Sequence, residues 1–262
     1  MKSRVLLGTS GYSYKDWVGP VYPEGTAGKD YLKHYAALFS FTELNFTYYR
    51  QPDPRTLDRM VTVTNDRFRF AIKAHQSMTH EITGNFKSDA AAFKQGIAPL
   101  IEASKLAAIL VQFPFSYHYN PQSRKHLQML CDEFAGMPLA VEFRNSEWAR
   151  DSLYEGLKKR GAAFVNVDEP PLSGLIKPSA IVTSHIAYAR FHGRNSANWW
   201  KGDNASRYDY LYNDMEMSEW IPRIKTMAQQ AGVVMVAFNN HWRGQAVKNA
   251  RRLRELMGAQ NE

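Results

Sequence analysis

This chain of 262 residues has little cysteine and no long apolar run; its one cysteine is Cys131. A single cysteine excludes an intrachain disulfide and a cysteine-based metal cluster, and it is typical of proteins from the reducing cytosol. No apolar stretch reaches the roughly 18 residues that span a bilayer. The apolar run near the start, residues 5–7, is too short for a signal peptide. We therefore expect a cytoplasmic protein without a membrane partner, with Cys131 packed in a helix.

Acidic residues are the scarcer charged class, with 25 Asp and Glu against 33 Lys and Arg and a formal net charge of +8. A basic protein of this kind favours phosphorylated or polyanionic partners over cationic ones. Much of the excess lies on segments with helical spacing, including residues 251–255, where a solvated helix face explains it. Basic residues at the ends of strands are therefore the ones that bear on chemistry.

Eight short apolar runs recur along the chain, and nearly every one ends in a charged or amide residue. They cover residues 6–11, 41–45, 68–73, 106–112, 139–144, 162–168, 186–193 and 233–240. Segments with helical spacing lie between them, at 29–39, 54–63, 89–104, 122–135, 151–160, 218–231 and 244–257. The alternation predicts an α/β fold, a single-domain TIM-type (β/α)8 barrel over residues 1–262. Three prolines in residues 169–184 predict that one outer helix is reduced or missing.

The strand ends of such a barrel meet at one rim, which is the reactive face of barrel enzymes. In residues 68–73 the apolar set Phe68, Phe70 and Ile72 should face the helices, so Lys73 should point into the barrel mouth. The same alternation pairs Glu43 with Asn45, Glu142 with Arg144, Asn166 with Asp168, and Arg190 with His192. Gln112 and one of Asn239 and Asn240 complete the predicted ring.

The ring suggests both ligand-holding and proton-transfer roles. An anionic group would be held by the cations Lys73, Arg144, Arg190 and Arg194, because Arg grips phosphate or carboxylate with two hydrogen bonds. General acid or base candidates are Glu43, Glu142, Asp168 and His192. An alternative is that Glu43, Glu142 and Asp168 only neutralise Lys73, Arg144 and Arg190 in a salt-bridge network that closes the barrel top.

The loops that follow strands are the long ones, notably 11–28, 74–88 and 194–217, and they should form a wall over the site. Their aromatic residues are Trp17, Trp199, Trp200, Tyr208, Tyr210 and Tyr212, with Lys201 and Arg207 among them. These rings could stack on bases or sugar faces while the cations bind phosphates. They could equally serve as anchors that pack the loops on the barrel.

A divalent metal is conceivable, because Glu43, Glu142, Asp168 and His192 offer oxygen and nitrogen ligands. The neighbouring cations disfavour a bare metal ion, so we predict no metal site, and the cofactor stays open. Familiar motifs are missing from the sequence: residues 80–84 lack the second His of a zinc protease, residues 8–13 lack the Lys of a P-loop, and no Gly-x-Ser-x-Gly elbow occurs.

A set of short sequence motifs in fixed order covers almost the whole chain. The motifs are GTSGYSYKDW with VYP (8–23), TELNFTYY (42–49), FAIK (70–73), VQFP (111–114), EFRNSEW (142–148), ARFHGR (189–194) and FNN (238–240). This ordered set resembles the domain-of-unknown-function 72 family, also called YecE-like. The resemblance implies a β/α-barrel fold and supplies no reaction. Asn145 follows EFR where relatives often carry His, so we expect no proton transfer at that position.

The pattern favours an enzyme that acts on a phosphorylated or other anionic substrate, such as a nucleotide or a phosphodiester. Acid and base chemistry at the C-terminal end of the barrel would make it a hydrolase, lyase or isomerase. The first alternative is a non-catalytic binding protein for single-stranded nucleic acid or a sugar phosphate. The second is a carbohydrate-active barrel enzyme, which would leave the Lys and Arg cluster without a purpose. Nothing in the pattern indicates an oligomeric state.

Overall fold

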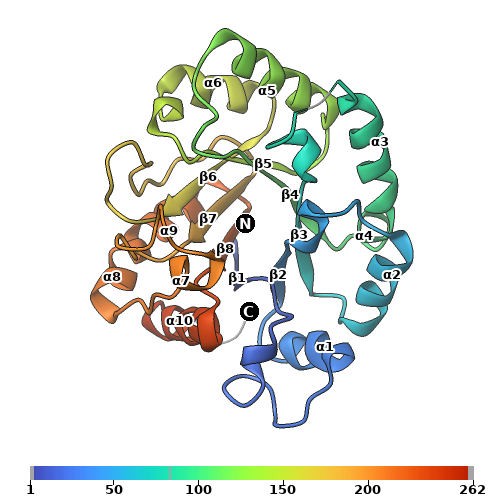
Figure 1. Ribbon diagram of the computed structural model, residues 1–262, viewed down its shortest axis with the longest axis vertical. Helices are drawn as coiled ribbons and strands as arrows, with labels where there is room; N and C mark the ends of the chain where they lie inside the picture. The colour runs from blue at the N-terminus through green and yellow to red at the C-terminus, as the bar shows by residue number, and fades with distance from the viewer. Residues whose placement is uncertain (1–2, 83, 259–262) are drawn as a thin grey trace.

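Eight parallel strands close into a barrel in the computed structural model, in the unbroken order β1 to β8 (Figure 1). The structure describes residues 3–82 and 84–258. The strands are β1 (Arg4–Ser10), β2 (Phe41–Leu44), β3 (Arg69–Lys73), β4 (Leu106–Gln112), β5 (Leu139–Glu142), β6 (Ala163–Asp168), β7 (Ile186–Phe191) and β8 (Val233–Phe238). Every predicted run overlaps one of them, so the predicted single-domain TIM-type fold is confirmed.

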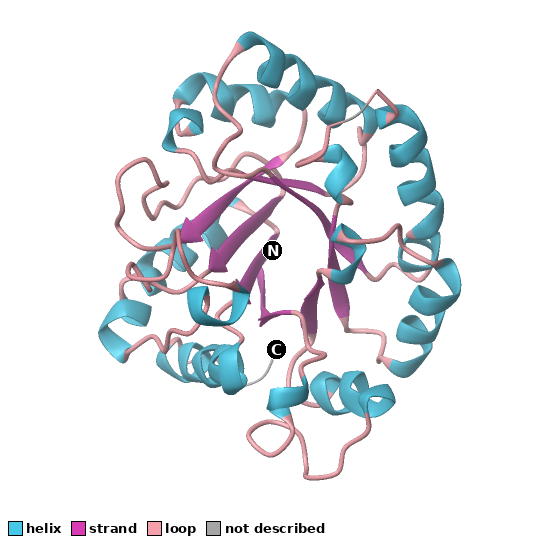
Figure 2. Ribbon diagram, viewed as in Figure 1, coloured by secondary structure: helices cyan, strands magenta, loops and turns pink. Residues whose placement is uncertain are grey.

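A ring of helices surrounds the strands (Figure 2). The α-helices are α1 (Tyr31–Ala36), α2 (Pro54–Val63), α3 (Phe86–Gly96), α4 (Ala98–Glu102), α5 (Pro121–Glu133), α6 (Asp151–Lys159), α7 (Asn204–Arg207), α8 (Asp214–Ser218), α9 (Trp220–Gln230) and α10 (Gln245–Leu256). Short 3-10 helices are η1 (Lys15–Trp17), η2 (Gly28–Asp30), η3 (Phe46–Tyr48), η4 (Gln76–Met78), η5 (Ser146–Trp148) and η6 (Trp242–Gly244). Helices α2 and α5 each begin at a proline that follows a capping side chain, Asp53 or Asn120.

The helix predictions differ from the structure in how two segments are divided. The predicted helix 89–104 is split into α3 and α4, because Pro99 lacks the N–H that a continuous helix would need there. The predicted helix 218–231 corresponds to α9 and is preceded by the separate turn α8. Asn213 and Glu216 form a capping box that starts α8 on its own.

An extended segment replaces the outer helix between β6 and β7, as the prolines predict. Residues 169–185, all of which the structure describes, contain no helix. The amide of Asn166 on β6 bonds to both backbone groups of Ile181, at 2.8 and 2.9 Å. Thr183 Oγ1 donates to the Ala162 carbonyl at 2.6 Å and accepts from the Phe164 N–H at 2.8 Å. These bonds hold the segment along the outer face of β6, where a helix would otherwise pack.

The apolar core lies inside the barrel and between the barrel and its helices. Inside, the rings of Phe41 and Tyr188 meet at nearly right angles, with their centroids 6.1 Å apart. Outside, Cys131 is buried on α5, as expected. Of the helices in residues 3–82 and 84–258, none combines the length and apolar character required to cross a membrane.

Candidate functional site

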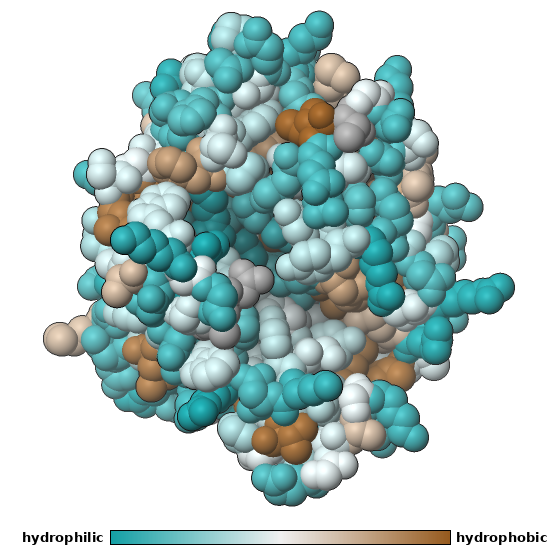
Figure 3. Space-filling model, in the orientation of Figure 1, coloured by the Kyte–Doolittle hydropathy of each residue, from teal (hydrophilic) through white to brown (hydrophobic). Residues whose placement is uncertain are grey.

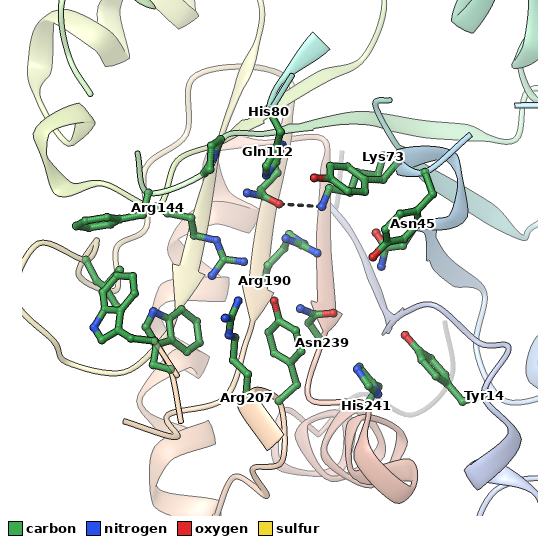
Figure 4. A pocket seen from close by; sticks show the side chains of 18 residues that line it. Tyr14, Asn45, Lys73, His80, Gln112, Arg144, Arg190, Arg207, Asn239 and His241 are labelled. Carbon is green, nitrogen blue, oxygen red and sulfur yellow. Dashed lines mark hydrogen bonds between the residues drawn. The ribbon is translucent and has the colours of Figure 1, made fainter. Parts of the chain in front are cut away.

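A cavity of about 630 Å³ opens at the carboxyl ends of the strands. In the space-filling view a hollow lies near the centre of the face, with hydrophilic residues inside it (Figure 3). Its wall carries four Lys or Arg side chains, Lys73, Arg144, Arg190 and Arg207 (Figure 4). Among the 18 described residues that line it, none is Asp or Glu. The wall therefore offers cationic groups to a ligand, and two of them, Arg144 and Arg190, are paired with carboxylates that lie behind it.

Arg190 is the centre of a buried network beneath the cavity. Its Nε and Nη2 donate to the two oxygens of Glu43 at 2.8 and 2.6 Å, and its Nη1 donates to Glu142 at 2.6 Å. Nη2 also donates to Ser10 Oγ at 3.0 Å, and Tyr188 donates to Glu43 at 2.6 Å. Burial opposes the charge of Arg190, but the two carboxylates outweigh it and raise the pKa of the guanidinium. Its bonds to described residues use four of five N–H groups and leave one on Nη1 for a ligand.

Arg144 joins two carboxylates at one side of this network. Its Nε lies 3.0 Å from Glu142 Oε1, and its Nη1 donates to Glu169 Oε2 at 3.0 Å. Burial alone would raise the pKa of Glu142, but Arg190 and Arg144 hold it well below its usual range. Burial raises the pKa of Glu169 to about 7, against the opposing pull of Arg144. Glu169 also accepts the Ile176 N–H at 3.1 Å and so ties the β6–β7 segment to the site.

His192 is fully buried behind the cavity wall. Asn239 Nδ2 lies 3.1 Å from its Nδ1 and Arg144 Nη2 lies 3.4 Å from the same atom, so Nδ1 accepts and the ring proton is on Nε2. Nε2 then faces Glu142 Oε1 at 3.3 Å. Burial, with Arg144 nearby, lowers the pKa of His192 to about 3, so the ring is neutral at physiological pH. His192 is thus hydrogen-bonded to Asn239, whereas its Nε2 lies near Glu142 without forming a hydrogen bond.

Lys73 differs from Arg144 and Arg190 because no described carboxylate forms an ion pair with it. Its Nζ donates to Gln112 Oε1 at 2.8 Å, the dashed contact of Figure 4, and lies 4.3 Å from the centroid of the Tyr48 ring. Burial and the neighbouring Arg190 lower its pKa to about 8. At neutral pH Lys73 is therefore mostly charged, and its charge is available to a ligand.

His80 lies beside Lys73 on the cavity wall (Figure 4). Its Nδ1 is 2.9 Å from Thr79 Oγ1, and its ring meets Tyr48 at nearly right angles with centroids 4.9 Å apart. Burial, followed by the charge of Lys73, lowers the pKa of His80 to about 4. His80 is therefore a neutral imidazole inside the cavity at neutral pH, and its low pKa makes it a weak base.

Aromatic rings form the upper wall. Trp199 is buried and lies 5.5 Å from the Arg144 guanidinium, whereas Trp200 is half exposed and contacts Phe115 with centroids 4.8 Å apart. On another part of the wall, Tyr14 and His241 stack with centroids 4.6 Å apart. The cavity therefore has a polar, cationic floor and a rim of aromatic rings.

Eight of the predicted site residues line this cavity: Asn45, Lys73, Gln112, Arg144, Arg190, Asn239, Trp199 and Trp200. Glu43, Glu142 and His192 lie behind the wall, where their polar atoms contact Arg190, Arg144 or each other. Part of the predicted salt-bridge network is therefore observed, since Glu43 and Glu142 pair with Arg190 and Arg144. The network leaves an open cavity above these two arginines.

Neither Asp168 nor Arg194 lines the cavity, although both are predicted site residues. Asp168 points away from the cavity, and its two oxygens accept from Arg194 at 2.9 and 2.7 Å, from Tyr212 at 2.7 Å and from Trp220 of α9 at 2.7 Å. Arg194 is held there and also donates to Glu219 at 2.9 Å. The prediction that Asp168 points into the barrel mouth together with Asn166 is wrong, because the inner set of β6 is Val165 and Val167, continued by Glu169. Arg194, predicted to help hold an anionic group, lies outside the cavity wall.

Asn240 and Trp17 also lie outside the cavity wall. Asn240 Nδ2 donates to the Tyr210 carbonyl and to Asn249 Oδ1, both at 2.8 Å, and so joins a loop to α10. Trp17 is fully buried, and its indole N–H donates to the His241 carbonyl at 2.7 Å. Both side chains anchor loops outside the cavity wall, and their contact with a ligand stays a prediction.

We expect Asp168→Asn to destabilise the fold without affecting ligand binding. The new amide would point a donor at the donors of Arg194, Tyr212 or Trp220, so the free energy of unfolding should fall by about 2–3 kcal/mol. Chemical denaturation measures this change. Asp214→Asn is the matched control, because Asp214 forms a similar two-bond pair with Arg252 that is exposed to water and should matter little. Equal stability of Asp168→Asn and the wild type would contradict the structural role.

Asn145 occupies a packing position. Its Oδ1 accepts the Glu147 N–H at 2.9 Å, and its Nδ2 donates to the Phe115 carbonyl at 3.1 Å. It therefore caps η5 and holds the loop that carries Phe115. A proton-transfer role is not required to explain this residue.

The sequence prediction omitted several residues of the site. Glu169 directly follows a predicted strand and would have been found by assigning Val165 and Val167 to the inner face. Ser10 lies at the end of a predicted strand but carries no charge. His80 belongs to a long loop, and only the fold brings it beside Lys73.

A metal site finds no support in the donor set. Within residues 3–82 and 84–258, no group of three or more His, Cys, Asp or Glu side chains is arranged to hold a metal ion. The acidic side chains nearest the cavity, Glu43, Glu142 and Glu169, are instead bonded to arginines. These residues do not fit a metal ion, and no step of the proposed chemistry uses one.

Comparison with known proteins agrees with the fold. A family model described as "Protein of unknown function DUF72" matches residues 6–262. The UPF0759 protein YunF of Bacillus subtilis (strain 168) is 30% identical over 269 aligned residues, which cover 97% of this chain and 94% of YunF.

Two solved structures resemble the barrel over nearly its whole length. A DUF72 family protein from Thermotoga maritima has a TM-score of 0.90 at 38% identity, covering 98% of this chain and 100% of that one. A DUF72 family protein from Enterococcus faecalis has a TM-score of 0.87 at 27% identity, covering 98% and 97%. The names of these proteins assign no activity.

Proposed function

This chain belongs to the DUF72 family of proteins of unknown function, and we propose that it is an enzyme acting on a phosphorylated or other anionic substrate at its barrel mouth. The observation that carries the proposal is the cavity wall, which has four Lys or Arg side chains and, among its described residues, no acidic one. An enzyme that binds a neutral sugar would gain little from such a wall.

The anion is proposed to bind at the floor of the cavity. Arg190 retains one N–H on Nη1, and Lys73 retains two N–H groups beyond its bond to Gln112. Arg144 supplies a guanidinium whose plane is fixed by Glu142 and Glu169. Because these cations are held by their partners before a ligand arrives, little side-chain freedom is lost when the anion binds.

Proton transfer is assigned to side chains that line the cavity. Lys73, with a pKa of about 8, can donate a proton near neutral pH, whereas His80, with a pKa of about 4, is a neutral and weakly basic ring that can hydrogen-bond to the ligand. Glu43 and Glu142 are less suited to this task, because Arg190 occupies oxygens of both. In this proposal the two glutamates hold Arg190 in place.

Arg207 offers a test of anion binding at the rim. Its Nε is buried and has no hydrogen-bond partner among the described residues, and Figure 4 shows the side chain directed into the cavity. We expect Arg207→Gln to weaken the binding of pyrophosphate about tenfold, measured by isothermal titration calorimetry. Arg251→Gln on α10 removes the same charge from an exposed position outside the cavity and should leave the affinity unchanged. Equal affinities of Arg207→Gln and the wild type would contradict the proposal.

A binding protein without chemistry is the second candidate, and the paired state of Glu43 and Glu142 favours it. Phosphorus NMR on mixtures of the protein with phosphomonoesters and phosphodiesters separates the two. The enzyme proposal predicts a new phosphorus signal with at least one ester, and loss of that signal in Lys73→Met. Binding of these esters without any transformation would favour the binding protein.

A further inference from the structure

Two aromatic side chains of the cavity are unusually exposed. Tyr49 is 66% and Trp200 is 50% exposed, and both line the cavity. Of the large hydrophobic side chains exposed in residues 3–82 and 84–258, these are the only aromatic ones. Exposed rings beside a pocket are typical of a surface that a partner covers.

The two rings lie on nearly opposite sides of the barrel mouth. Tyr49 follows β2 and Trp200 follows β7, and in the closed barrel β8 and β1 separate these strands. Tyr49 contacts Tyr48 at 90° and Trp200 contacts Phe115 at 67°, contacts that fix each ring without covering it. The cationic floor of the cavity lies between them.

Each exposed ring is followed in the chain by an exposed cation. Arg50 follows Tyr49, and Lys201 follows Trp200. A ring next to a cation matches the alternation of base and phosphate along a nucleic-acid strand. The two rings therefore line the cavity on either side of its floor, and each is followed in the chain by an exposed cation that lies outside the cavity wall.

We propose that the substrate at this site is single-stranded nucleic acid, which crosses the barrel mouth with bases stacked on Tyr49 and Trp200. The phosphates next to these bases contact Arg50 and Lys201, and a phosphate between them enters the cavity. The inference rests on the proposed function, because that central phosphate is the anion held by Lys73, Arg144 and Arg190. A duplex fits less well, because its bases stack on one another and offer their edges to a protein.

Fluorescence anisotropy with a labelled oligodeoxythymidylate of about 12 nucleotides, and with the matching oligouridylate, tests the proposal. Tyr49→Ala and Trp200→Ala should each weaken strand binding about tenfold, and the double variant about a hundredfold, since the rings lie apart. Both variants should bind pyrophosphate as the wild type does. Met215→Ala, which removes an exposed apolar side chain that does not line the cavity, is the control and should change neither affinity.

Three results would overturn the inference: a strand that binds no tighter than pyrophosphate, alanine variants that bind the strand as well as the wild type, or a duplex that binds as tightly as the single strand. Each of these leaves the proposed function standing if pyrophosphate still binds. The proposed function fails separately, if pyrophosphate does not bind or if Lys73→Met binds it as tightly as the wild type. A preference between the two oligonucleotides identifies the strand as DNA or RNA.

Discussion

Arg190→Met should lower the free energy of unfolding by about 3–5 kcal/mol near neutral pH, because it leaves buried carboxylates uncompensated. Arg190 bonds to both oxygens of Glu43 and to one oxygen of Glu142, and all three side chains are buried. Chemical denaturation measures the loss. Arg251→Gln, an exposed Arg on α10, is the control that should retain wild-type stability.

Partial recovery by a second substitution would identify the cause of this loss. In the Arg190→Met background, Glu43→Gln removes one stranded charge and should restore part of the stability, whereas in the wild type it breaks a buried pair and should destabilise. Stability of Arg190→Met within about 0.5 kcal/mol of the wild type would contradict the role of Arg190.

The loss should also depend on pH. In the wild type the pKa of Glu142 is held well below its usual range, so its contribution to stability is present above the unfolded-state pKa and is lost as pH falls through the folded value. Without Arg190, burial favours the protonated carboxyl, so the variant becomes more stable relative to the wild type as the pH falls. The difference in the free energy of unfolding between wild type and variant should therefore become smaller as the pH falls from about 7 to about 5.

Lys73→Met should weaken the binding of pyrophosphate by about 10- to 100-fold, because a buried ammonium contributes charge-assisted hydrogen bonds. The effect of this substitution on binding is easier to interpret than that of a substitution at Arg144. No described carboxylate is paired with Lys73, so none loses its partner. Isothermal titration calorimetry measures the affinity. Lys158→Met, an exposed change on α6, is the matched control.

The pH dependence gives the same prediction a second readout. With a pKa of about 8, Lys73 is charged at neutral pH and loses its proton as pH rises through that value. Wild-type affinity should therefore fall in this range, and Lys73→Met should lack that part of the decline. A pyrophosphate affinity that is equal in the two proteins would show that Lys73 does not bind the anion.

The barrel could be predicted because each strand is a short apolar run and the helices lie between them. The face of β3 was equally clear, since Phe68, Phe70 and Ile72 are all apolar and leave Lys73 for the inside. Strand β6 gives no such signal. Its outer set includes Phe164 and Asn166, and its inner set includes Val165 and Val167, so both sets contain apolar residues and alternation alone assigned Asp168 to the wrong face.

The rest of the site could not be predicted because it depends on contacts between distant loops. Trp17 and Trp200 both lie in long loops of the sequence, yet Trp17 is buried and donates to the His241 carbonyl, whereas Trp200 is half exposed. His80 becomes part of the site only because η4 follows the strand that ends in Lys73. The charge of the cavity depends in the same way on which acidic side chains lie behind its wall.

A crystal structure of the protein grown with thymidine monophosphate tests the central claim, that the cationic cavity holds an anion, most directly. The account predicts phosphate density within hydrogen-bond distance of Lys73 Nζ and of Arg144 or Arg190 Nη1, with the base toward the aromatic rim. Phosphate density elsewhere on the surface, or a nucleotide with its base at the floor and its phosphate in solvent, would contradict it.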